Sequence, residues 1–526
     1  MKSRKRGAYS LAKIRTANYV LTLKLDTNNR DEILLNKRFE ICRKLYNAIL
    51  GLGLKKFNAL SELKIYRKLR KDLLEINKLY FKDEESKKCK INDQLRKQKY
   101  KELTDLLGEY GINEYSLINK MTPMYKSFNK NIDNKTAQAL ASRAWKALEK
   151  LIFMDAQKVN FIRYGELKSV EGKWNKSGIT YRDGIIKWNG VKIPAIVKSN
   201  DIYAPKAIQD KIKYCRIVGK FVNGKHKYYV QLIMDGIPPI KYNKETGDIK
   251  RSVGLGNVGI DIGTQTIAIS SKYDVKLLEL CPEINNIQGI KTKLSRKLDR
   301  QRRVNNPNNY NNDGTIKFGI MINKKKEKLT WVKSNKYIKT QMELRDIQRK
   351  QTDIRKQSHE KLANYIISLG DRILVETMSY KGLQKRSKKT TINARTGKFN
   401  KKKRFGKSLG NKAPAKLIEI INRKLKYDEL EILKINTHKV KASMYNHFTD
   451  KYIKKELKDR WGVSTGIQRD CYSAFLIMNV SNDLESINRN LCFGSYDNFK
   501  QLHDREINRL RTSKENGNKL IASMGI

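Results

Sequence analysis

Three carboxylates far apart in the sequence stand where acids are unusual or well placed to act. Asp261 interrupts the apolar run VGIDIGTQTIAIS, Glu376 ends the run ILVE, and Asp470 lies in the first turn of an expected helix. A charge inside an apolar strand is unfavourable unless something compensates it. Three acids brought together would repel one another, and Mg²⁺ is the cation that prefers oxygen ligands. We therefore predict a magnesium site, with two ions that activate water and stabilise the leaving oxygen of a phosphodiester.

The elements expected around these acids follow the order of an RNase H-like domain. Three short antiparallel strands are expected in NVGIDIGTQ, TIAISS and VKLLEL, then a basic helix, a long helix over about 335–369 and a fourth strand, DRILVETM. A helix in PAKLIEIINRKLKY, a fifth strand in EILKINT and a last clear helix in IQRDCYSAFLIMNVSNDL complete the order. In such a sheet the first and fourth strands are neighbours and the last helix crosses them. The order therefore predicts that the three acids converge.

Each acid also has an ordinary interpretation. Glu376 could be a surface acid at a strand end, and a carboxylate at position 470 would be favoured by the helix dipole. Asp261 is the hardest of the three to explain in this way. The glycines Gly254, Gly256 and Gly259 spell GxGxxG, but they precede a strand and do not open a helix, so a dinucleotide site is not indicated.

The charge of the chain points to a polyanionic partner. Its 526 residues include 112 Lys and Arg against 53 Asp and Glu, a net charge of +59 that is spread along the sequence. Such a field favours nucleic acid. No apolar run is long enough to cross a bilayer, so we expect a cytoplasmic protein with no membrane partner. The abundant Lys, Asn and Ile indicate an AT-rich, prokaryotic genome. Six scattered cysteines without a CxxC pair indicate neither disulfides nor a thiolate zinc site.

The first half of the sequence predicts a helical block inserted into a small β-barrel or sandwich. NYVLTLKL alternates like a strand, and the pattern is then helical to about residue 160. Two hairpins follow, in GIIKWNGVKIPAI and in KYCRIVGKFVNGKHKYYVQLIMDG, the second with an Asn223-Gly224 turn. The first strand is expected to complete their sheet.

Three segments resemble the RuvC motifs of the TnpB family of transposon-encoded nucleases and of the compact type V CRISPR effectors similar to it. They are GIDIG, ILVETMSYKGL and QRDCYSAFLIMNV, and they match Asp261, Glu376 and Asp470 to the family's catalytic metal ligands. The resemblance implies a multidomain α+β protein. Its parts would be a wedge β-barrel (1–30 and 161–250), a helical recognition lobe (31–160), an RNase H-like (RuvC) nuclease domain (251–492) and a C-terminal tail (493–526).

The sequence departs from this family in two places. Residues 436–467 replace the usual four-cysteine zinc ribbon, so no zinc is expected, and His438 and His447 are interpreted as surface or nucleic-acid contacts. Gln468 replaces the first aspartate of the family's DRD, while Arg469 is expected to reach a phosphate or brace the site. A basic insertion, 384–411, supplies further candidate contacts to a nucleic-acid backbone. They are Lys401, Lys402, Lys403 and Arg404.

The resemblance implies an RNA-guided DNA endonuclease. A guide RNA would pair with one strand of double-stranded DNA beside a short flanking motif, and Mg²⁺ would be the cofactor, with no small-molecule cofactor. The origin of the guide, from a CRISPR array or a transposon end, stays open. A nuclease-dead RNA-guided repressor would share the fold but would not need the acids. A DNA transposase with an RNase H-like core would need the acids but not the wedge and lobe. A structural RNA-binding protein would leave Asp261 unexplained.

Overall fold

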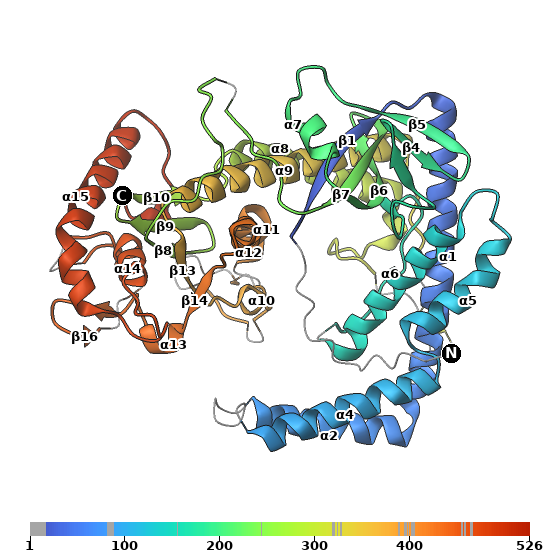
Figure 1. Cartoon of the computed structure of the whole chain (residues 1–526), viewed down its shortest axis with the longest axis horizontal. Helices are drawn as coiled ribbons and strands as arrows, with labels where there is room; N and C mark the ends of the chain where they lie inside the picture. Colours follow the sequence, from blue (N-terminus) through green and yellow to red (C-terminus); the bar gives the residue numbers. More distant parts are fainter. Residues whose placement is uncertain are drawn as a thin grey trace. The chain divides into compact units, whose positions relative to one another are not determined.

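The computed structural model describes residues 17–81, 89–154, 156–243, 245–317, 321–322, 325–326, 329–387, 390–393, 397, 399–400, 405–453, 456, 459–462 and 466–526. The chain divides into two compact units, Met1–Pro239 and Ile240–Ile526. Both are drawn in Figure 1, and each is described by itself.

The first unit contains the helical block that the sequence predicts. Its helices are α1 (Asn29–Glu62), α2 (Lys64–Tyr80), α4 (Lys90–Glu109), α5 (Glu114–Lys126), α6 (Asn134–Phe153) and the short α7 (Tyr203–Ile208). Polar side chains fix where several of them begin. Asn28 and Asp31 form a reciprocal capping box at α1, and Asp133 accepts a hydrogen bond from the Thr136 N–H at α6.

The sheet of the first unit has seven strands in the order β2-β6-β7-β1-β5-β4-β3. Their bounds are β1 Asn18–Leu25, β2 Ser169–Glu171, β3 Thr180–Arg182, β4 Ile185–Trp188, β5 Val191–Ile196, β6 Ile212–Val222 and β7 Lys225–Asp235. The predicted hairpins β4–β5 and β6–β7 are present, and Asn223 and Gly224 turn the second at φ 48° and 80°. Strand β1 pairs with β7 and β5, so it completes the sheet as expected.

The predicted barrel is instead an open, half-barrel sheet. Over the described residues, the hydrogen-bonded order runs from β2 to β3 without a ladder that joins these two end strands. Each of the two has only three residues. Strands this short offer too few backbone groups to close the sheet.

The second unit is built on a five-stranded mixed sheet with the order β10-β9-β8-β13-β14. The strands are β8 Asn257–Ile262, β9 Thr266–Ser271, β10 Val275–Glu279, β13 Arg372–Glu376 and β14 Leu433–Ile435. The first three form an antiparallel meander, and β13 is parallel to both β8 and β14. The predicted neighbourhood of the first and fourth strands is therefore confirmed.

Helices cover both faces of this sheet. One face packs on α9 (Asn335–Ser368) and α12 (Pro414–Leu425), and the other packs on α14 (Arg469–Met478) and α15 (Arg489–Glu515). The remaining elements are α8 (Ile284–Asn305), η1 (Pro307–Asn309), β11 (Met321–Ile322), β12 (Lys325–Lys326), α10 (Tyr380–Leu383), α11 (Gly406–Lys412), η2 (Lys426–Asp428), α13 (Thr437–Val440), β15 (Tyr445–Asn446), β16 (Lys451–Tyr452) and η3 (Ala522–Met524). Residues 471–478 of α14 are all buried between the sheet and α15.

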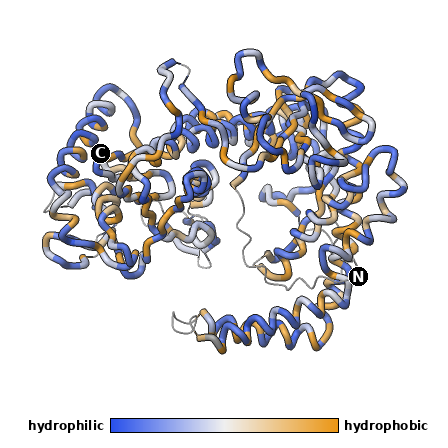
Figure 2. Tube along the Cα trace, in the orientation of Figure 1, coloured by the Kyte–Doolittle hydropathy of each residue, from blue (hydrophilic) through white to orange (hydrophobic). Residues whose placement is uncertain are grey.

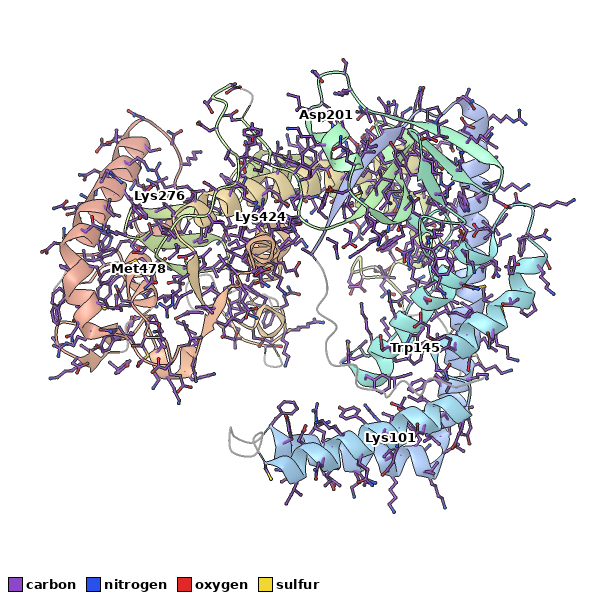
Figure 3. All side chains as sticks on the ribbon, viewed as in Figure 1. Lys101, Trp145, Asp201, Lys276, Lys424 and Met478 are labelled. Atoms are coloured by element: carbon purple, nitrogen blue, oxygen red, sulfur yellow. The ribbon has the colours of Figure 1, made fainter. Side chains whose placement is uncertain are left out.

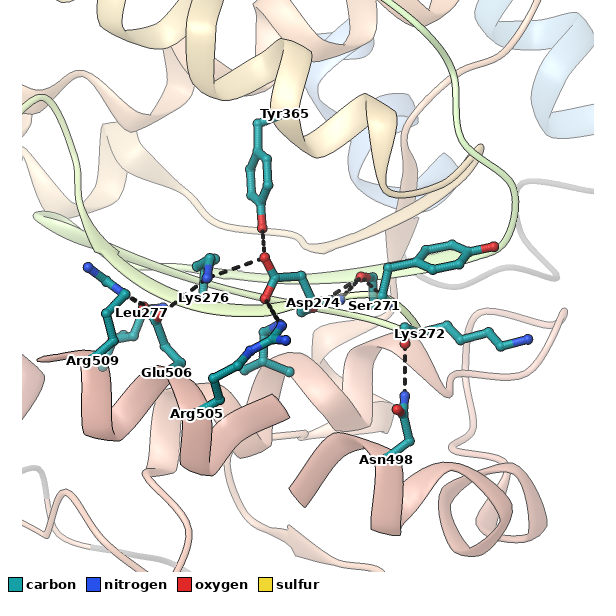
Figure 4. Close-up of polar contacts among 12 residues, drawn as sticks. Ser271, Lys272, Asp274, Lys276, Leu277, Tyr365, Asn498, Arg505, Glu506 and Arg509 are labelled. Carbon is teal, nitrogen blue, oxygen red and sulfur yellow. Dashed lines mark hydrogen bonds and ion pairs between the residues drawn. The ribbon is translucent and has the colours of Figure 1, made fainter. Parts of the chain in front are cut away.

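Helix α15 was not predicted from the sequence. The last clear helix expected there corresponds to α14, and residues 493–526 were expected to form a C-terminal tail. Helix α15 packs beside the edge strand β10 (Figure 4), where the buried Glu506 carboxylate accepts a hydrogen bond from the Leu277 N–H at 3.1 Å and pairs with Arg509. Asp274, next to the same strand, accepts hydrogen bonds from Tyr365 of α9 and from Arg505. Because polar groups such as Glu506 occupy the buried face of α15, its apolar periodicity is weak.

Among the helices of the described residues, none combines the length and apolar character that a membrane crossing requires. In Figure 2 the long helices alternate between hydrophilic and hydrophobic positions along their length, as expected where one side packs on a core.

Candidate metal-dependent active site

Asp261 and Glu376 lie side by side at the ends of neighbouring parallel strands. The last paired residues of β8 and β13 are Ile260 and Val375, and the two acids come next on each strand. Adjacent strands are about 4.8 Å apart. Side chains alternate between faces along a strand, and Ile260 and Val375 belong to the core beneath α9 and α12. Both acids therefore project from the opposite face, which α14 covers.

A glycine lets α14 lie directly on β8. A Cβ built at Gly259 would be 2.0 Å from the Ala474 carbonyl oxygen and 2.3 Å from the Met478 nitrogen. Farther back along the strand, the Asn257 side chain donates to the Met478 carbonyl at 3.1 Å. The helix, marked by Met478 in Figure 3, thus runs opposite to the strand. Asp470 precedes Ala474 by about one helical turn, so the antiparallel helix places it beyond Gly259, toward Asp261.

Asp470 sits at the second position of α14, behind the N-cap Gln468. Its carboxylate lies 3.7 Å from the Arg460 guanidinium, and both side chains are largely covered. The Arg469 guanidinium donates to the Glu456 carbonyl at 3.0 Å, and its positive charge also acts on Asp261. Arg469 therefore ties α14 to the chain at Glu456, and its role at the site stays a prediction.

Burial affects all three acids, and the charges of the other two also act on Asp261. Burial raises the pKa of Asp261 well above its usual value, and the negative charges of Asp470 and Glu376 raise it further. Burial also raises the pKa of Glu376, and that of Asp470 in spite of Arg460 and Arg469. Carboxylates that are desolvated and placed near one another favour either protonation or a bound cation.

The donor set fits a hard cation better than a zinc ion. All three groups are carboxylates, the ligands that Mg²⁺ accepts together with water and phosphate oxygens. Among the described residues, no three His, Cys, Asp or Glu side chains are already gathered closely enough to hold a metal ion. The assignment of Asp261, Glu376 and Asp470 as metal ligands therefore stays a prediction.

Sequence reasoning missed one polar group beside the acids. Tyr380 opens the short helix α10 just after β13, and its hydroxyl is buried with no hydrogen-bond partner. Burial and the negative charge of Asp261 together raise the pKa of this hydroxyl to about 12. The hydroxyl is thus a neutral donor next to the candidate ligands. Nothing in the sequence ILVETMSYKGL marks it except its position after Glu376.

The GxGxxG glycines serve packing. A Cβ at Gly254 would be 2.2 Å from the Ser368 carbonyl oxygen, and one at Gly370 would be 2.2 Å from the Gly256 carbonyl oxygen. Gly254 and Gly370 thus let the chain just before β8, which includes Gly256, pack against the turn between α9 and β13. Gly259 lets α14 pack directly on β8. This agrees with the rejection of a dinucleotide site.

His447 was wrongly expected at the surface. It is fully buried, and its ring is surrounded by aromatic rings of Phe448, Tyr472, Phe475, Phe493 and Tyr496. Its Nδ1 lies 2.6 Å from the Tyr472 hydroxyl, while Nε2 has no partner. An aromatic cluster therefore holds this part of 436–467 against α14 and α15. His438 is exposed.

The described residues also offer a basic surface on α8. A shallow groove of about 480 Å³ is lined by Gln288, Lys291, Thr292, Ser295, Arg296, Asp299 and Arg300. Its one acid, Asp299, already pairs with Arg302 and Arg303 outside the groove. Three cations and two hydroxyls on one helix face suit a phosphate backbone. The predicted contacts at 401–404 lie outside the described residues.

Comparisons with known proteins give structural similarity only. No family model and no curated protein matches the chain. A cryo-EM structure of a Cas12f1-sgRNA-target DNA complex is similar with a TM-score of 0.38 and 10% identity, covering 87% of this chain and 98% of that one. A CRISPR-Cas12f ternary complex has a TM-score of 0.23 and 12% identity, covering 85% of this chain and 81% of that one.

Proposed function

We propose that the protein is an RNA-guided DNA endonuclease whose phosphodiester cleavage depends on Mg²⁺ held by Asp261, Glu376 and Asp470. The observation that supports the proposal is that Asp261 and Glu376 follow the last paired residues of neighbouring parallel strands, while α14, which carries Asp470, packs on β8 at Gly259. Divalent cations bound there would activate water and neutralise the charge that develops on the leaving oxygen.

The residues around the acids have supporting roles. Asp261 and Glu376 are fixed by strands, which gives them little freedom to move apart. Asp470 is placed by the contact between α14 and Gly259. Arg460 and Arg469 lower the electrostatic repulsion among the acids until a cation binds.

The guide RNA and the DNA target follow from the resemblance to the TnpB family and from the net charge of +59. A net charge of this size suits a protein that must hold RNA and DNA together. The groove on α8 is one surface that we assign to a nucleic-acid backbone.

The test begins with the RNA that co-purifies with the expressed protein. That RNA is sequenced, and a DNA duplex library that contains its complement is incubated with the complex in Mg²⁺ and in EDTA. We expect a discrete RNA, and cleavage only of the matched duplex and only with Mg²⁺. A discrete RNA with binding but no cleavage would support the nuclease-dead repressor, and cleavage without any RNA would support the transposase.

A further inference from the structure

The buried side chain of Gln468 joins the candidate active site to residues 520–526. Its Oε1 accepts a hydrogen bond from the Cys471 N–H at 2.9 Å, which caps α14. Its Nε2 donates to the Met524 carbonyl at 3.1 Å. A glutamine can do both because its amide carries an acceptor and a donor, whereas an aspartate offers acceptors alone.

The backbone of Gln468 is also held. Its N–H donates to His503 Nε2 of α15 at 3.0 Å, and His503 Nδ1 faces Asp504 Oδ1 at 2.9 Å. This pattern requires the neutral histidine with its proton on Nδ1. Gln468 is therefore bonded on three sides, two residues before Asp470.

A second connection runs through Arg460. The Gly525 carbonyl accepts a hydrogen bond from the Trp461 indole at 2.7 Å. A Cβ built on Gly525 would be 2.3 Å from the Arg460 Cβ, and Gly525 has a φ of 72°. The backbone at 525 thus lies against the arginine whose guanidinium is 3.7 Å from Asp470.

The segment that makes these contacts is itself anchored. Met524 is buried in the core beneath α14 and α15, and Leu520, Ile521 and Ile526 pack at its margin. Because four apolar side chains pack this segment against the core, it can hold Gln468 and Arg460 in place, as an unpacked segment could not.

We propose that residues 520–526 act as a clamp that positions Asp470 for cation binding, through Gln468 at the helix N-cap and through Arg460 beside the carboxylate. The inference rests on the proposed function, because Asp470 is its candidate metal ligand. Gln468 and Gly525 are positioning residues, since neither touches a reacting atom. The clamp also gives a reason for glutamine where the family has the first aspartate of DRD.

Two substitutions test the clamp by different routes. Gln468→Met keeps the length and neutrality of the side chain but removes both hydrogen bonds, and Gly525→Ala places a methyl group against Arg460. Matched controls are Gln348→Met, at an exposed position of α9, and Gly517→Ala, which has a similar φ of 83° but open space around it. Thermal melting in EDTA first establishes a temperature at which every variant is folded.

The decisive readout is Mn²⁺ affinity, measured by electron paramagnetic resonance on the folded protein, with single-turnover cleavage beside it. Loss of residues that orient a ligand commonly weakens metal affinity about tenfold or more. We expect Gln468→Met and Gly525→Ala to show that loss and the controls to show none. If Gln468→Met and Gly525→Ala fold and bind Mn²⁺ as tightly as wild type, the proposed clamp is wrong. Wild-type protein that binds Mn²⁺ but cuts no matched DNA would contradict the proposed function alone, and one that binds no Mn²⁺ would contradict both.

Discussion

Gly259 of β8 and Ala474 of α14 meet backbone to backbone, so closely that a Cβ at position 259 would be 2.0 Å from the Ala474 carbonyl oxygen. This contact sets the height of α14 above the sheet and thereby the position of Asp470 over Asp261. Since both partners are backbone within regular elements, neither can yield without moving its element.

Gly259→Ala should therefore damage both stability and function. We expect a loss of about 3 kcal/mol or more in unfolding free energy, because the added methyl group forces the helix off the strand. Urea denaturation measures the loss. Gly289→Ala is the matched control, since its Cβ would meet open space on α8. Equal stability of the two variants would contradict the packing described.

Asp261→Asn should stabilise the metal-free protein. Because the pKa of Asp261 is raised in the folded state, the folded protein binds its proton more tightly than the unfolded chain does. Stability is gained as pH falls through the folded pKa, and the charged group costs stability at neutral pH. We expect the amide to raise the melting temperature in EDTA at pH 7.5 by about 2 °C or more. The exposed Glu419→Gln is the control, and an Asp261→Asn variant that melts below wild type would refute the expectation.

Acid should weaken the packing around the buried His447. Burial and the nearby Arg489 lower the pKa of His447 to about 4, below its ordinary 6.5. The unfolded chain therefore binds more protons between these values, so this contribution is present above pH 6.5 and is lost as pH falls toward 4. We expect wild type to lose about 3 kcal/mol from this group over that window.

His447→Phe keeps an aromatic ring and removes the titration, so its stability should fall less between pH 7 and pH 4.5. Urea midpoints at the two values measure the difference. The control is His438→Phe, at an exposed position, which should lose as much stability between the two pH values as wild type does. If His447→Phe loses as much stability as wild type, the buried neutral histidine is not the source.

The α8 groove should contribute to nucleic-acid affinity through charge. Arg296→Gln and Arg300→Gln each remove one cation from it, so each should weaken binding of the co-purified RNA or its DNA target and lower the slope of log affinity against log salt by about 1. Filter binding at several salt concentrations gives the slope. Lys416→Gln, at a lysine already paired with Glu419, should leave the slope unchanged. Wild-type slopes for both groove variants would exclude this surface.

The sequence predicted the second unit well because its signals are local. The order of short apolar strands and a long helix along the chain was enough to predict that β8 and β13 are neighbours. It therefore also predicted that Asp261 and Glu376 lie on adjacent strands. The hairpin turn at Asn223-Gly224 could also be predicted from the sequence, because few residue pairs adopt two consecutive positive φ values.

What escaped prediction depends on contacts between distant residues. Helix α15 buries His503 and Glu506 on its inner side, so hydrophobic periodicity understates it. His447 is polar by type but packs like an aromatic core residue. The bond from Gln468 to the Met524 carbonyl joins positions whose spacing carries no motif.

The most direct test is the rate at which the RNA-bound protein cuts its matched DNA in Mg²⁺, compared between wild type and Asp261→Asn. The variant keeps the shape of the side chain and, by the argument above, the fold. We predict rapid cleavage by wild type and a rate at least ~100-fold lower for the variant, with target binding retained. Equal rates for the two proteins would contradict the assignment of Asp261 to a metal-dependent nuclease site.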